Sequence, residues 1–222
     1  MIELQSLTKS FRTRSGRRYV FRDLSFTFPP RTNIGLIGRN GAGKSTLMRL
    51  LGGIDQPDHG RIVTDCSLSW PVGLTGGFVT KLTARENVRF VCSIQGCTGA
   101  AMRERVEFVR RFADIGDYFD LPMNSYSSGM RSRVAFGLSM AFEFDYYLID
   151  EVMAVGDAHF RSASRKTLTQ RLKGANVILT SHNMGDIRTH CDVVVLIEDG
   201  RAVVYEDVER GIRAYQKQDT EE

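Results

Sequence analysis

The chain has 222 residues, of which 42% are hydrophobic, with a formal net charge of +4 and a pI near 9.0. This length allows one compact unit with a real core, and no apolar run approaches the roughly 20 residues of a membrane-spanning helix. Residues 1–4 have neither a basic flank nor an apolar stretch, so we predict no secretory signal and expect a cytoplasmic location.

The first predicted elements are strands at residues 2–4, 21–28 and 34–37, and the third leads into a glycine-rich loop. Residues 38–46 follow the pattern G-x-x-x-x-G-K-[ST], and its glycines allow successive N–H groups to point at phosphate oxygens. A helix predicted from Lys44 adds its N-terminal dipole at the same point. Lys44 would reach the β- and γ-phosphates, and the Ser45 hydroxyl would ligate Mg²⁺. The alternative is a plain turn with a surface lysine. The residues predicted to bind the phosphates are Gly38, Arg39, Asn40, Gly41, Ala42, Gly43, Lys44, Ser45 and Thr46.

The middle of the chain, residues 73–145, is predicted to be rich in helix, with helices at 85–94, 102–113 and 131–144. Ser127 and Ser128 precede the last of these helices and suit its N-terminal cap. Taken alone, these serines indicate only a capped helix.

Two later strands end in polar residues. The apolar run 146–149 is followed by Asp150 and Glu151. In a parallel sheet, this position places carboxylates beside the phosphate loop, where one can hold Mg²⁺ and the next can polarise a water. A solvated acidic turn is the alternative. The strand predicted at 177–181 ends at His182, and a lone histidine in such a place is usually structural.

Strands separated by helices predict an α/β fold with a parallel sheet covered on both faces. The order of phosphate loop, Ser-x-Gly helix start, Asp-Glu strand end and strand-His resembles the ATP-binding cassette (ABC) ATPases over nearly the whole chain. The resemblance implies a P-loop NTPase core with a mainly parallel sheet, formed by residues 1–72 and 146–222. It also implies an N-terminal antiparallel β subdomain and an inserted helical subdomain at 73–145.

The resemblance also assigns roles to single residues. Ser127 and Gly129 match the signature motif, which is altered here at Ser128 and Met130. Asp150 matches the Mg²⁺-linked aspartate, Glu151 the catalytic glutamate and His182 the switch histidine. Residues 154–157 take the place of the loop that contacts the second subunit, and 197–201 that of a late β-hairpin turn.

Two features of the family match this sequence less clearly than the motifs above. The family's adenine-stacking aromatic corresponds to Phe11, with Tyr19 as the second choice and an ordinary core or rim aromatic as the alternative. Most members place a glutamine near residue 72, and here Gly73 stands in that position. Water or the backbone of residues 73–77 would take over its role, unless the match is displaced by a few residues.

Segments 69–78, 82–88 and 126–133 resemble more closely the ATP-binding subunits of bacterial capsular polysaccharide exporters. This resemblance implies a homodimer that binds two ATP and Mg²⁺ at the cytoplasmic face of the inner membrane. It also implies a separate membrane-spanning permease and capsular polysaccharide as indirect cargo. Exporters of O-antigen or teichoic acid are the alternative within the family. A soluble ABC protein of translation or DNA repair normally has two cassettes or a long coiled-coil insert. A non-hydrolysing module would not need Asp150 and Glu151 together with His182.

The remaining reactive and charged residues indicate no further chemistry. Cys66, Cys92, Cys97 and Cys191 lack C-x-x-C spacing, which favours free thiols over disulfides or zinc. Arginines cluster at 12–18 and 103–111 without an aromatic-interleaved recognition motif. We therefore predict no nucleic-acid partner, and we explain the basic balance by proximity to an anionic membrane leaflet.

Overall fold

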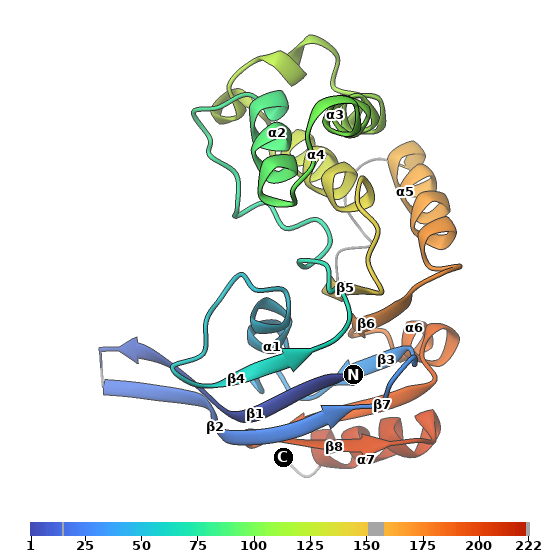
Figure 1. Cartoon of the computed structure of the whole chain (residues 1–222). Helices are drawn as coiled ribbons and strands as arrows, with labels where there is room; N and C mark the ends of the chain where they lie inside the picture. The colour runs from blue at the N-terminus through green and yellow to red at the C-terminus, as the bar shows by residue number, and fades with distance from the viewer. Residues whose placement is uncertain (15, 151–157, 221–222) are drawn as a thin grey trace. The chain divides into compact units, whose positions relative to one another are not determined.

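The computed structural model describes residues 1–14, 16–150 and 158–220. Their contacts define two compact units, whose elements are labelled in Figure 1. The first unit contains residues 1–71, 144–150 and 174–220, and the second contains 72–143 and 158–173. All the named strands belong to the first unit, and the second is built from helices.

An antiparallel sheet of three strands in the order β2-β1-β4 starts the first unit. Its strands are β1 (Ile2–Thr13), β2 (Gly16–Phe28) and β4 (His59–Thr64). This sheet confirms the predicted N-terminal antiparallel subdomain. The first two strands are longer than predicted because they continue into an exposed hairpin, in which Thr13 pairs with Gly16. Shifts of register between Leu4 and Ser10 break the alternation of apolar residues that would have marked the full strand.

The second sheet has five strands in the order β5-β6-β3-β7-β8. They are β5 (Tyr146–Asp150), β6 (Asn176–Thr180), β3 (Ile34–Ile37), β7 (Val193–Glu198) and β8 (Arg201–Tyr205). The first four are parallel and β8 is antiparallel, which confirms the mainly parallel sheet. The predicted turn at 197–201 joins β7 to β8, and Asp199 and Gly200 adopt positive φ angles of 45° and 74°.

Helices cover both faces of the five-stranded sheet. Helix α1 (Lys44–Leu51) buries four apolar side chains in a core cluster shared with β1, β2 and β3. Val193, Val195 and Ile197 of β7 belong to that cluster, so Val194 faces the opposite side of the sheet. Helix α7 (Val208–Thr220) packs there, as does α6 (Met184–His190). The buried β3 strand is therefore held in a fixed position, which matters because the phosphate loop follows it directly.

An ion pair stabilises the end of α1. The guanidinium of Arg49 donates to both carboxylate oxygens of Asp55, at 2.8 and 2.9 Å. These hydrogen bonds hold the pKa of Asp55 below its usual range.

The second unit consists of α2 (Ala84–Ile94), α3 (Gly99–Ala113), α4 (Ser128–Met140) and α5 (Ala158–Arg171), with short 3₁₀ turns at Gly116–Asp120 and Met123–Ser125. Phe112 stacks on Phe136 at 5.7 Å and meets Phe160 edge-on at 5.5 Å.

Helix α4 begins earlier than predicted and ends at Met140. The chain then leaves the helix, and Phe144 packs against the rings of Trp70 and Tyr147. None of the helices in the described parts of the chain has both the length and the apolar character needed to cross a bilayer.

Candidate nucleotide-binding site

The phosphate loop, residues 38–46, connects the fully buried strand β3 to α1. Gly38 and Gly43 have φ angles of 154° and 106°, and a Cβ on either would collide with neighbouring atoms. At Gly38 the collision is with the carbonyl oxygen of Ile197, and at Gly43 it is with the Val20 side chain. Both positions therefore require glycine, and the backbone turns sharply before the first helical N–H groups.

Lys44 is the first residue of α1, and its ammonium group folds back over the loop. Its Nζ donates to the carbonyl oxygen of Gly38 at 2.5 Å and to that of Arg39 at 3.0 Å. Ser45 and Thr46 follow in the same helical turn, where Ser45 is exposed and Thr46 is half-buried. A cation, a hydroxyl and a helix N-terminus thus lie together, and this arrangement suits a polyphosphate.

Three adjacent parallel strands, β5, β6 and β3, end at the same edge of the sheet as this loop. Asp150 and Thr180 are the last residues of β5 and β6, and they are paired in register. The Thr180 hydroxyl is completely buried and donates to Asp150 Oδ1 at 2.5 Å, which fixes the carboxylate. His182 follows β6 and is exposed. The structure brings these residues to the edge predicted from sequence, whereas Glu151 and residues 154–157 lie outside the described part of the chain.

The predicted signature residues lie in the second unit, at the start of α4. Ser127 is the N-cap of this helix, and its hydroxyl accepts a hydrogen bond from the Met130 N–H at 3.2 Å. Ser127 is exposed and Gly129 is half-buried. Both line a cavity of about 480 Å³ with Asp114, Ile115, Tyr118, Met130 and Arg133. The capping serine predicted from sequence is confirmed, and the helix presents free N–H groups beside a cavity.

The two candidate aromatic partners of the base differ in their surroundings. Tyr19 lines a cavity beside the phosphate loop, and the Arg22 guanidinium lies 3.9 Å from the centre of its ring. Phe11 is 45% exposed, with Lys9 Nζ at 5.4 Å from its ring, and it does not line that cavity. The role of Phe11 stays a prediction. Arg18 also lines the cavity, and our sequence interpretation missed it, although its pairing with Phe11 follows from the hairpin register.

The glycine loop, residues 73–77, precedes α2 in the second unit. Gly73 has a φ of 79°, and a Cβ on Gly76 or Gly77 would meet no atom within 4 Å. The segment after it is held firmly: Asn87 of α2 is only 2% exposed, and its amide accepts from the Val79 N–H at 2.8 Å and donates to the Val79 carbonyl at 3.1 Å. Sequence inspection missed Asn87, because a buried asparagine inside a helix has no local signal.

Two of the four cysteines, Cys92 and Cys191, have buried thiols. All four are free, as predicted. Burial raises the pKa of Cys191 to about 12 and also raises that of Cys92. The described residues include no cluster of three or more His, Cys, Asp or Glu side chains arranged for a metal ion.

Comparison with known proteins gives a consistent set of relatives. The family model of the ABC transporter matches residues 21–154, more than half of the chain. The polysialic acid transport ATP-binding protein KpsT of Escherichia coli is 49% identical over 216 residues, covering 97% of this chain and 96% of its own length. The capsule polysaccharide export ATP-binding protein CtrD of Neisseria meningitidis is 40% identical over 97% of this chain and 98% of its own length. The O-antigen export system ATP-binding protein RfbB of Klebsiella pneumoniae is 36% identical over 94% of this chain and 86% of its own length.

The solved structures show the same fold. A dimeric ATP-binding cassette in a post-hydrolysis state, bound to ADP and Pi, superposes with a TM-score of 0.71 at 19% identity. The superposition covers 92% of this chain and 98% of the cassette.

Proposed function

The chain belongs to the ABC transporter family, and we propose that it is the ATP-hydrolysing subunit of an exporter of capsular polysaccharide. The observation that carries the ATPase part is the edge of the five-stranded sheet, where the phosphate loop follows β3, Asp150 ends β5 and His182 lies just after β6. The cargo is supported by relatives named for polysialic acid transport and capsule polysaccharide export, which match this chain almost from end to end. The O-antigen relative is less similar, at 36% identity.

In this proposal, residues of the phosphate loop hold the triphosphate. The N–H groups that begin α1 point toward bound phosphate oxygens, and Lys44 exchanges its two carbonyl partners for the β- and γ-phosphates. This exchange places a positive charge where negative charge develops during phosphoryl transfer.

A magnesium ion fits the same edge of the sheet. Ser45 offers an exposed hydroxyl oxygen, and Asp150 offers a carboxylate fixed by Thr180. Mg²⁺ prefers oxygen ligands and is usually bound through one or two protein groups together with substrate phosphates, so the absence of a larger ligand cluster from the described residues agrees with such a site. When bound, the ion would neutralise charge on the β- and γ-phosphates.

The hydrolytic step needs a group that activates water. We assign this role to Glu151, which follows the last residue of β5 in sequence and would accept the proton of the attacking water. His182 follows the adjacent strand, and we propose that it braces the γ-phosphate. Asp150, held through its hydrogen bond to Thr180, keeps the strand end in a fixed position for both.

The signature residues would act in a second copy. The chain contains one phosphate loop, while the N-terminus of α4 with Ser127 and Gly129 is a further site suited to an anion. We propose that two copies enclose two ATP molecules and that each copy presents Ser127 and Gly129 to the γ-phosphate held by the other. The solved cassette with the same fold is a dimer.

Transport would need a separate membrane-spanning partner. The described helices include none that could cross a bilayer, and the similar proteins are named as ATP-binding proteins of transport and export systems. We place the subunit at the cytoplasmic face of the inner membrane, where ATP is available. The glycine loop is our candidate for contact with the permease.

A charge-removal variant tests the proposal. Lys44→Ala should weaken ATP binding roughly 10- to 100-fold, since hydrogen bonds to charged groups contribute about 1.5–3 kcal/mol. It should also abolish display of polysaccharide in cells that lack their own export ATPase. Lys173→Ala, which removes an exposed lysine of the second unit, is the matched control and should behave as the unchanged protein. ATP hydrolysis by the Lys44→Ala protein at the normal rate would refute the assignment of the site. If the unchanged protein hydrolyses ATP normally but no polysaccharide is displayed, the assignment of capsular polysaccharide as the cargo would be refuted.

A further inference from the structure

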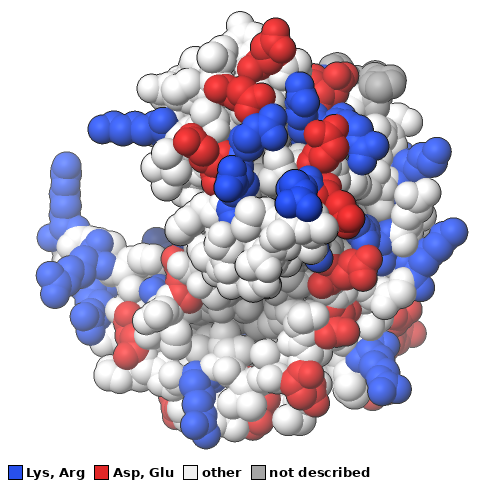
Figure 2. Space-filling model, turned by 45° about the horizontal axis from the view of Figure 1, so that its top comes forward, with Lys and Arg blue, Asp and Glu red and all other residues white. Residues whose placement is uncertain are grey.

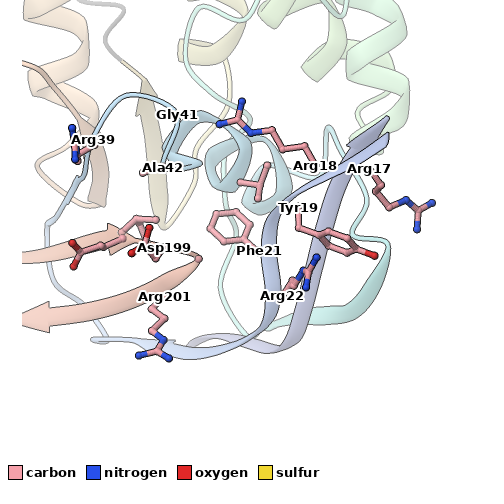
Figure 3. A pocket seen from close by; sticks show the side chains of 14 residues that line it. Arg17, Arg18, Tyr19, Phe21, Arg22, Arg39, Gly41, Ala42, Asp199 and Arg201 are labelled. Atoms are coloured by element: carbon pink, nitrogen blue, oxygen red, sulfur yellow. The ribbon is translucent and has the colours of Figure 1, made fainter. Parts of the chain in front are cut away.

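A cavity of about 630 Å³ lies in the first unit, beside the phosphate loop (Figure 3). Three segments line it: residues 17–22 of β2, residues 39, 41 and 42 of the loop, and the turn 197–201. The cationic side chains on this lining are Arg17, Arg18, Arg22, Arg39 and Arg201, and the acidic ones are Glu198 and Asp199. The lining therefore has an excess of positive charge directly beside the loop.

The register of the hairpin separates the two neighbouring arginines of β2. Arg18 pairs with Phe11 and Arg17 pairs with Arg12, so Arg18 shares its face of the hairpin with Phe11 while Arg17 is on the other face. Figure 3 shows this difference: the Arg18 side chain extends toward Gly41, and that of Arg17 points away from it. A Cβ built on Gly41 would lie 3.8 Å from Arg18 Nη2, so the guanidinium is close to the phosphate loop.

The Arg18 guanidinium is available for a ligand. Although it lies beside the loop, it makes neither a hydrogen bond nor an ion pair to any of the residues that the structure describes. Arg22, by contrast, is stacked on Tyr19. Figure 2 shows Lys and Arg side chains gathered at its left edge, the side where Figure 1 places the tip of the β1–β2 hairpin. A positive charge without a carboxylate partner, close to a phosphate-binding loop, is suited to an anionic ligand.

We infer that Arg18 is a nucleotide-binding residue of this chain, donating from its guanidinium to phosphate oxygens of the ATP that the loop holds. The inference rests on the proposed function and extends it, because it adds a cation from the antiparallel sheet to Lys44 of α1. The planar, forked guanidinium matches two phosphate oxygens at once, and Arg18 reaches the loop from the same hairpin face as Phe11. Phosphate recognition at Arg18 and base contact at Phe11 would then come from one pair of cross-strand neighbours.

The test compares two adjacent arginines of equal charge. Arg18→Ala should weaken binding of ATP and of GTP equally, by about tenfold, since a charge-assisted hydrogen bond to phosphate is lost and the base is not involved. The affinity for AMP, which lacks the β- and γ-phosphates near the loop, should fall less in this variant. Arg18→Lys should restore part of the affinity as a point charge. Arg17→Ala should weaken the three affinities much less than Arg18→Ala does, because the Arg17 side chain points away from the loop. Equal melting temperatures of the variants confirm that each has folded.

Three results would overturn the inference. Equal effects of Arg18→Ala and Arg17→Ala would mean that only the overall charge matters. A loss confined to ATP, with GTP unaffected, would mean that Arg18 contacts the base. Unchanged affinity in Arg18→Ala, while Lys44→Ala loses ATP, would refute the role of Arg18 and leave the proposed function intact. Retention of ATP by Lys44→Ala would instead count against the proposed function itself.

Discussion

Asn87 holds the segment between the glycine loop and α2 in place, and we predict that its replacement by alanine destabilises the protein. Its buried amide accepts from the Val79 N–H at 2.8 Å and donates to the carbonyl oxygens of Val79 at 3.1 Å and Thr83 at 2.9 Å. Replacement by alanine removes these three bonds and leaves the Val79 N–H without its side-chain partner. At about 1 kcal/mol each, the loss is about 3 kcal/mol. For a protein of this size, the melting temperature should fall by about 6–12 °C.

The measurement combines thermal unfolding with amide hydrogen exchange. Exchange at the Val79 N–H should accelerate in Asn87→Ala, because this amide is bonded to the Asn87 side chain. Asn124→Ala is the matched control: its side chain is exposed in the same unit, so the melting temperature should change little. A fall of less than 2 °C in Asn87→Ala, or unchanged protection of the Val79 amide, would refute the reasoning.

Four other changes test the site and its surroundings. Glu151→Gln should keep ATP binding and reduce hydrolysis by roughly 10²–10⁴, the contribution of a positioned base, in a steady-state phosphate-release assay; near-normal turnover would exclude Glu151 as the base. Ser127→Arg should leave ATP affinity of the monomer intact and abolish hydrolysis, whereas weaker binding by a strictly monomeric sample would place Ser127 in its own chain's site. Replacing Gly76 and Gly77 by alanine should impair stimulation by the permease more than ATP affinity, and a proportional fall of both would make the loop merely structural. Asp55→Asn should lower stability at neutral pH by about 1 kcal/mol, because the pair is partly exposed. The folded-state pKa of Asp55 is lowered, so the difference should persist above the unfolded value of about 3.9 and vanish as the pH falls through the folded value, in melts at pH 3 and 7.

The sequence predicted the parts of the fold and site that depend on local patterns. The buried run at 34–37 and the glycines after it favour a strand followed by a tight loop, and the structure confirms both, together with the start of α1 at Lys44. The binding of phosphate by that loop stays a prediction. Ser127 as a helix cap was likewise visible, because capping needs only one side chain and the next turn.

Other features depend on partners far away in the chain. The full length of β1 and β2 was missed because exposed arginines and shifts of register hide the strand pattern in the hairpin. Thr180 was placed in a strand, but its bond to Asp150 joins two strands that are 30 residues apart. Arg18 was missed because its position beside Gly41 is visible only in the folded chain. Asn87 was missed although its partners lie within eight residues, because a buried asparagine inside a helix has no local signal.

The anchoring of Val79 by Asn87 bears on the coupling of the proposed nucleotide site to the proposed permease. The chain passes from the first unit to the second after Pro71, immediately before the glycine loop. Gly76 and Gly77 are unconfined, while Val79 is fixed to α2 through Asn87. We therefore expect residues 73–77 to change backbone conformation more readily than the segment from Val79 onward, because the Val79 backbone is bonded to α2 through Asn87. On this argument, Asn87→Ala should loosen the attachment of Val79 to α2, whereas alanine at Gly76 and Gly77 should restrict the loop itself, so the two variants should change stimulation by the proposed permease through different segments.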